Sequence, residues 1–181
     1  MVAYYVQSLF IFFAIFSLLG GLVASFYFAR LDSSARYWVV AALIGGVFNM
    51  ATVFREDLPP LWSYSIPIGL GGASFVLMGL GIARLYNKGP QWRSLLGLVA
   101  GTLVFIVVME WARVHAGPKV TLLLSGGLFG LTSLWGAYFA HVHYQRSSNQ
   151  FSMHMRWVMV SLGLFHLLRT QGVVTGWGVN T

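Results

Sequence analysis

Residues 54–86 of the chain read FREDLPPLWSYSIPIGLGGASFVLMGLGIARLY. The stretch opens with a charged turn in which Pro59 and Pro60 stop any preceding helix. An uncharged run of about 22 residues follows from 62 to 83, and ~20 residues are enough to cross the hydrocarbon core of a bilayer. Gly69 and Ala73 form a small-xxx-small pair, which lets membrane helices approach closely. The stretch therefore predicts a membrane helix around which the remaining helices pack.

The composition indicates the same environment for the whole chain. The 181 residues are 57% hydrophobic and 8% charged, with a mean hydropathy of +0.74. A soluble domain carries about 25% charged residues. The net charge of +7 comes from basic residues in short loops between apolar runs, so we expect a lipid bilayer and not nucleic acid as the partner. The chain has no cysteine, which leaves no thiolate metal site.

The apolar runs predict an all-α fold, a polytopic membrane bundle of six transmembrane helices in a single domain spanning residues 1–181. Short loops of charged, glycine and proline residues separate the runs, and the polar segment 141–156 is the longest of them. Residues 1–7 lack the basic start of a cleaved signal peptide, so the first helix is expected to stay in the mature protein. The predicted helices span residues 5–29, 37–54, 62–86, 94–112, 120–143 and 157–177.

The lysines and arginines predict the orientation. Seven of the eleven follow the first, third and fifth helices, and four lie on the other side. The seven are Arg30, Arg36, Arg84, Lys88, Arg93, Arg146 and Arg156. The four are Arg55, Arg113, Lys119 and Arg169. The positive-inside rule places the larger set in the cytoplasm. We therefore expect a multi-pass protein of the bacterial inner membrane with its N-terminus outside.

Five polar residues inside or beside the apolar runs are candidate ligand-binding residues: Asn49, Glu110, Arg113, His166 and Arg169. At a rise of ~1.5 Å per residue, all but Arg113 fall in one layer between the midplane and the outer third of the membrane. Unpaired charges at such a depth cost ~2.5–3.5 kcal/mol each, which predicts that Glu110 and Arg169 face the interior and pair. The layer is either a ligand pocket open to the outside or a structural ion pair with His166 in the core.

Metal and catalytic chemistry have little support in the sequence. His141 and His143 are two residues apart and would point to different faces of a helix. The triplet from Met153 to Met155 offers soft ligands that suit copper, but no further ligand accompanies it. Nucleophile–base pairs, phosphate loops and paired carboxylates do not stand out. We therefore expect no metal, haem or other cofactor, no catalytic residue and no enzymatic activity.

Four segments resemble one known family. They are ARYWVVAALIGGVFNMATVFR (35–55), REDLPPLWS (55–63), MGLGIARLYNKGPQW (78–92) and MRWVMVSLGLFHLLRTQG (155–172). Together they resemble the multi-helix membrane region at the N-terminus of bacterial signalling proteins, such as GGDEF-type diguanylate cyclases and histidine kinases. The resemblance implies a sensor region. Such proteins add one more helix and a cytoplasmic catalytic domain, which these residues lack, so the chain is expected to be a truncated sensor region or a stand-alone relative.

Three functional hypotheses follow from these features. The first is a non-enzymatic sensing or signal-input module with an outward-facing polar pocket. The second is a small structural or accessory subunit of a larger membrane complex, whose small-residue helix faces contact another membrane protein or a second copy. The third is a small transporter, a class that often shows internal repeats. Residues 1–90 and 91–181 show no convincing repeat.

Overall fold

The computed structural model describes residues 2–85, 92–148 and 150–174, and no strand occurs among them. These residues form helices joined by short turns, which confirms the predicted all-α class. The six α-helices are α1 (Val2–Phe26), α2 (Ser33–Val53), α3 (Ile66–Arg84), α4 (Trp92–His115), α5 (Pro118–Ser147) and α6 (Gln150–Val174). Two short helical turns, η1 (Phe28–Arg30) and η2 (Leu61–Ser65), precede α2 and α3.

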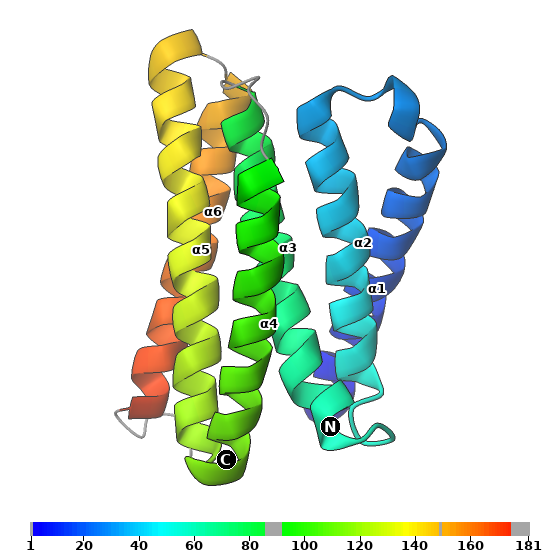
Figure 1. Ribbon diagram of the computed structural model, residues 1–181, viewed down its shortest axis with the longest axis vertical. Coiled ribbons are helices and arrows are strands. Elements are labelled where there is room, and N and C mark those ends of the chain that lie inside the picture. The colour runs from blue at the N-terminus through cyan, green and yellow to red at the C-terminus, as the bar shows by residue number, and fades with distance from the viewer. Residues whose placement is uncertain (1, 86–91, 149, 175–181) are drawn as a thin grey trace.

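Helix α3 lies in the middle of the bundle. It packs against α2, α4 and α5, while α1 lies on the far side of α2 and α6 packs on α5 (Figure 1). The glycines of α3 allow these close contacts. A Cβ atom added to Gly79 would come within 2.6 Å of the Trp135 ring on α5. The glycine-rich stretch is therefore the helix around which the others are arranged, as its sequence predicts.

Helices α5 and α6 also approach each other through small residues. A Cβ atom on Gly126 would lie 3.3 Å from the backbone carbonyl oxygen of His166 on α6. A Cβ atom on Gly130 would lie 2.8 Å from the Leu167 side chain. The small-xxx-small spacing of these two glycines in α5 thus serves the contact with α6.

Several helix ends differ from the predicted bounds. Helix α2 begins at Ser33 and not at residue 37, because Asp32 caps it: its Oδ1 accepts hydrogen bonds from the N–H groups of Ser34 and Ala35, both at 2.8 Å. These hydrogen bonds, with Ala35 the largest contributor, hold the pKa of Asp32 below its usual value. The expected helix from residue 62 begins as the π-helical turn η2, directly after Pro60.

The polar segment 141–156, expected to be a loop, is largely helical. Helix α5 continues to Ser147 and α6 begins at Gln150, with Ser148 at φ 51° in the left-handed region between them. Polar side chains do not stop a helix, so both helices continue past the apolar runs that marked their expected ends. Residue 86, Lys88 and residues 175–177, which the predictions include, lie outside the described residues.

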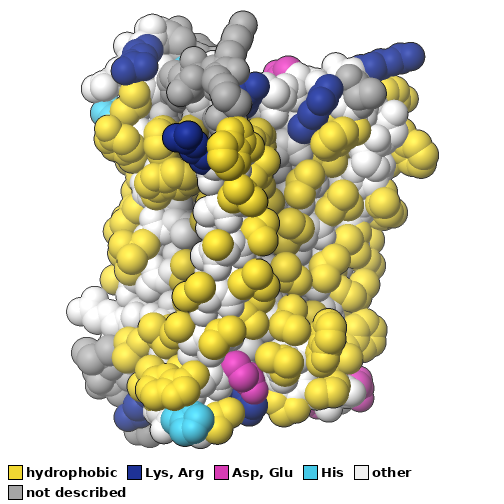
Figure 2. All heavy atoms as spheres, in the orientation of Figure 1, with side chains coloured by type: hydrophobic (Ala, Val, Ile, Leu, Met, Phe, Trp, Pro, Cys, Tyr) yellow, Lys and Arg dark blue, Asp and Glu magenta, His cyan; other side chains and the backbone are white. Residues whose placement is uncertain are grey.

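The two ends of the bundle differ in the residues that they carry. The proline-turn end holds residues 54–60 and Gly117, between α2 and α3 and between α4 and α5. The arginine end holds Asp32, Arg36, Arg84 and Ser148. Figure 2 shows hydrophobic side chains covering the middle of one face, with charged side chains gathered toward the two ends.

Four helical segments are long and apolar enough to cross a membrane: Ser33–Val53, Leu61–Arg84, Trp92–His115 and Pro118–Arg146. Their outward surfaces suit lipid, since Val107 on α4 is 68% exposed. The apolar described part of α1, Phe10–Phe26, is shorter. Helix α6 carries histidines, arginines and glutamines along its length, which lower its hydropathy. Four membrane-spanning helices thus meet this criterion among the described residues. The total of six transmembrane helices stays a prediction.

Candidate functional site

Glu110 is the centre of a polar cluster near the proline-turn end. Its Oε2 accepts hydrogen bonds from Ser65 Oγ at 2.7 Å and from Arg113 Nε at 3.0 Å, and its Oε1 accepts one from an Arg113 terminal nitrogen at 2.5 Å. The π-helical turn η2 ends at Ser65, which is fully buried. Glu110 and Arg113 lie three residues apart on α4, so they share a helix face. The cluster ties the start of α3 to the end of α4.

The predicted pair between Glu110 and Arg169 does not form. Glu110 binds Arg113 and Ser65, and Arg169 is exposed on α6. The helices explain the difference, since α4 packs against α3 and α5 while α6 packs against α5. A partner three residues away on the same helix satisfies the carboxylate without any contact across the bundle. The depth estimate placed the two residues at one level but carried no information about which helices are neighbours.

His166 lies in an aromatic environment between α5 and α3. Its ring centroid is 5.1 Å from that of Phe129 and 5.9 Å from that of Phe75, and its Nδ1 is buried without a hydrogen-bond partner among the described residues. His166 and Arg169 line one crevice of about 10 Å³, at the lower limit for a single water molecule. The structure thus brings these two candidates together beside α5, in a space too small for an organic ligand.

Asn49 stands apart from the other candidates. Its side-chain amide donates a hydrogen bond of 2.9 Å to the Gly45 carbonyl oxygen one turn earlier in α2. Such a bond satisfies the amide within its own helix. Of the five candidates, the structure therefore brings together Glu110 with Arg113, and His166 with Arg169. Ligand binding by the five residues stays a prediction.

A polar pocket of about 370 Å³ does lie at the proline-turn end, but other residues form it. Arg55, Glu56 and Asp57 of the turn after α2 supply its charges, and Gln7 of α1 faces them. All three turn residues are exposed. The sequence marked this turn as a helix stop and not as a pocket wall, because nothing in it showed that α1 would begin beside it.

Groups of three or more potential metal-ligating side chains are absent from the described residues. His141 instead contacts Arg156, whose terminal nitrogen lies 2.9 Å from His141 Nδ1. The Arg156 guanidinium also lies 4.8 Å from the Trp157 ring centroid. This arrangement holds α5 and α6 together near the arginine end and offers no cluster for metal binding within the described part of the chain.

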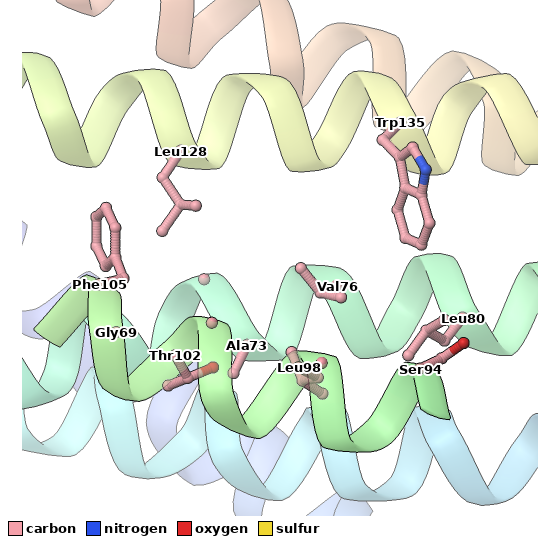
Figure 3. A pocket seen from close by; sticks show the side chains of 13 residues that line it. Gly69, Ala73, Val76, Leu80, Ser94, Leu98, Thr102, Phe105, Leu128 and Trp135 are labelled. Carbon is pink, nitrogen blue, oxygen red and sulfur yellow. The ribbon is translucent and has the colours of Figure 1, made fainter. Parts of the chain in front are cut away.

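Sequence reasoning also missed an apolar cavity of about 400 Å³ between α3, α4 and α5. Figure 3 shows Leu128 and Trp135 of α5 on one side and residues of α3 and α4 on the other. Ser94 and Thr102 supply its polar side chains, and apolar side chains and glycines form the rest. The complete lining is Gly69, Gly72, Ala73, Val76, Leu80, Ser94, Gly97, Leu98, Gly101, Thr102, Phe105, Leu128 and Trp135.

Two glycines on α4 keep this cavity open. A Cβ atom added at Gly97 or at Gly101 would meet no atom within 4 Å. The Gly-xxx-Gly spacing of this pair resembles a helix-packing motif, yet in this structure it faces empty space. The spacing alone would predict a close helix contact, so the sequence carried no signal for the cavity.

Comparisons with protein-family models, with curated proteins and with solved structures found no match to the chain. The resemblance to the membrane region of bacterial signalling proteins therefore stays a prediction. The geometry alone carries the functional argument: a polar cluster that is satisfied within the bundle, and an apolar cavity among three helices.

Proposed function

We propose that this chain is a membrane-embedded signal-input module, without catalytic activity of its own, that binds a lipophilic molecule from the bilayer. The cavity between α3, α4 and α5 is the observation that supports the proposal. Its volume of about 400 Å³ is within the range of small-molecule sites, which are concave and mostly apolar. This ligand differs from the polar one that the sequence suggested, because the candidate charges are bound to each other or exposed.

The shape of the cavity favours a chain-like ligand. It runs along α4 from Ser94 to Phe105, about 16 Å at ~1.5 Å per residue. One leaflet of the hydrocarbon core is about 15 Å deep. Ser94 lies at one end of this run and offers a hydroxyl group for a single polar end. A straight or isoprenoid chain with one hydroxyl or carbonyl group matches these dimensions.

Filling the cavity tests this function. Farnesol and dodecanol serve as probes, and thermal unfolding in detergent measures binding. At a hundredfold excess over its dissociation constant, a bound probe should raise Tm by about 5–10 °C. Gly101→Phe should abolish this rise while the protein keeps its helicity, because its side chain enters space that is empty now.

The matched control is Gly20→Phe on α1, where a Cβ atom also meets nothing within 4 Å and which does not line the cavity. This variant should keep the full rise in Tm. A rise that persists in Gly101→Phe, or one lost equally in Gly20→Phe, would show that the probes bind elsewhere. No rise with either probe in the wild-type chain would remove the support for a lipophilic ligand.

One observation favours the second candidate function, an accessory subunit of a larger membrane complex. Helix α1 packs against α2, and its outer face carries Phe12 at 61% and Phe16 at 69% exposure beside the open Gly20. Such a face suits another membrane helix as well as lipid. Purification in mild detergent distinguishes the two functions. A stable assembly with different subunits favours the accessory role, whereas a monomer or homodimer counts against it.

A further inference from the structure

A second cavity, of about 440 Å³, lies at the arginine end among η1, α2, α3 and α4. It differs from the first because its lining includes two arginines and a serine beside aromatic and aliphatic side chains. Its lining is Phe28, Ser33, Arg36, Tyr37, Val40, Leu77, Arg84, Trp92 and Leu95. None of these residues lines the cavity between α3, α4 and α5.

The two arginines come from different helices and are held in place. Arg36 of α2 donates from Nε to the Leu31 carbonyl oxygen at 3.2 Å, and its guanidinium lies 5.5 Å from the Phe28 ring centroid. Arg84 of α3 donates from Nε to Ser33 Oγ at 2.9 Å. A guanidinium has five N–H donors in a planar fork, and this geometry suits the oxygens of a phosphate. The cavity is therefore walled by two positioned groups of the kind that binds phosphate.

The local charge is positive. Asp32 is the nearby carboxylate, and its Oδ1 accepts hydrogen bonds from Ser34 and Ala35 at the start of α2. It lies close enough to Arg36 to interact with its charge. The other three acidic residues of the chain, Glu56, Asp57 and Glu110, lie toward the opposite end. The Asp32 carboxylate offsets only one of the two arginine charges. The net positive charge that remains favours a bound anion.

We propose that this cavity binds the headgroup and upper acyl chain of an anionic phospholipid. The arginines would bind the phosphate diester of the headgroup. The apolar walls would contact an acyl chain, which a free phosphate lacks. Trp92 and Tyr37 have the amphipathic rings that favour the membrane interface, where lipid headgroups lie. A zwitterionic lipid would bring an extra ammonium group against the two guanidinium groups. The site is independent of the lipophilic ligand proposed above, because its residues and its chemistry are separate.

Binding measurements with defined lipids test the site. The purified full chain in dodecyl maltoside is titrated with phosphatidylglycerol, phosphatidylcholine or inorganic phosphate, and bound lipid is counted by native mass spectrometry. We expect phosphatidylglycerol to bind about 30-fold more tightly than phosphatidylcholine, the scale of two basic residues near anionic headgroups. The double variant Arg36→Gln with Arg84→Gln should lose this preference.

The matched control is Arg146→Gln, which removes an exposed arginine near the same end of the bundle, outside the cavity. It should keep the preference. Leu95→Trp leaves both arginines in place and fills the apolar part of the cavity, so it should weaken phosphatidylglycerol binding. This variant tests the site even if the double variant does not fold. The proposal would be overturned if the wild-type chain bound the two lipids equally well, or if the double variant kept the preference. It would also be overturned if Leu95→Trp bound phosphatidylglycerol as tightly as the wild-type chain, or if inorganic phosphate bound as tightly as phosphatidylglycerol.

Discussion

At the residue scale, the Glu110 carboxylate is the group whose partners matter most. Ser65 and Arg113 both donate to it, and Ser65 is fully buried. Removing the serine hydroxyl should cost about 1.5–3 kcal/mol of unfolding free energy, the scale of a hydrogen bond to a charged group. We expect Ser65→Ala and Glu110→Gln to be non-additive in a double-mutant cycle, measured by denaturant unfolding in mixed micelles.

The same cycle distinguishes the two arginines. Glu110→Gln and Arg113→Gln should show a coupling energy, because their side chains form an ion pair. The effects of Glu110→Gln and Arg169→Gln on the free energy of unfolding should be additive, because α6 places Arg169 beside α5 and away from the carboxylate. Coupling with Arg169 and additivity with Arg113 would mean that the carboxylate pairs across the bundle after all.

At the element scale, the adjacent glycines Gly126 and Gly127 of α5 differ in their surroundings, and only Gly126 contacts α6. A Cβ atom on Gly126 would clash with Thr170 Oγ, and Thr170 is held by a hydrogen bond of 2.8 Å to the His166 carbonyl oxygen. A Cβ atom on Gly127 would meet nothing within 4 Å. Gly126→Ala should therefore destabilise the protein by about 1–3 kcal/mol. Gly127→Ala should be neutral or stabilising by up to about 1 kcal/mol, since alanine favours a helix.

Denaturant unfolding in mixed micelles, with helicity as the signal, measures both alanine variants. The pair is a matched control because the two positions are neighbours on one helix and receive the same substitution. Equal losses of stability would indicate that α5 is sensitive to any added side chain. Unchanged stability in Gly126→Ala would indicate that α6 moves away at little cost.

At the scale of the whole molecule, the orientation in the membrane is the property to test. The chain has no cysteine, so a single introduced cysteine is the only thiol that a maleimide can label. Asp57→Cys and Ala116→Cys lie at the proline-turn end, and Ser148→Cys lies at the arginine end. If the positive-inside rule holds, an impermeant maleimide should label the first two in intact cells and Ser148→Cys only after lysis. The reverse pattern would place the arginine end outside.

The sequence by itself determined the helical class and the central place of the glycine-rich helix that follows Pro60. These follow from local properties: a run too apolar for water, and glycines that permit close contact on several sides. The spacing of Gly126 and Gly130, four residues apart, is likewise readable along one helix, and the structure uses this pair for the contact with α6. The helix ends were less readable, since the cap at Asp32 and the turn at Ser148 depend on individual hydrogen bonds and backbone angles.

Only the tertiary structure decided which side chains meet. Glu110 and Arg169 share a predicted depth, yet their helices pack on different neighbours, so Glu110 takes a partner from its own helix and one from η2. Both cavities have the same origin, since each is walled by at least three helical segments whose mutual positions no local pattern specifies. Gly97 and Gly101 illustrate the limit, because a spacing that favours close packing faces an open space here. Depth and spacing are properties of one helix, whereas a site is a property of several.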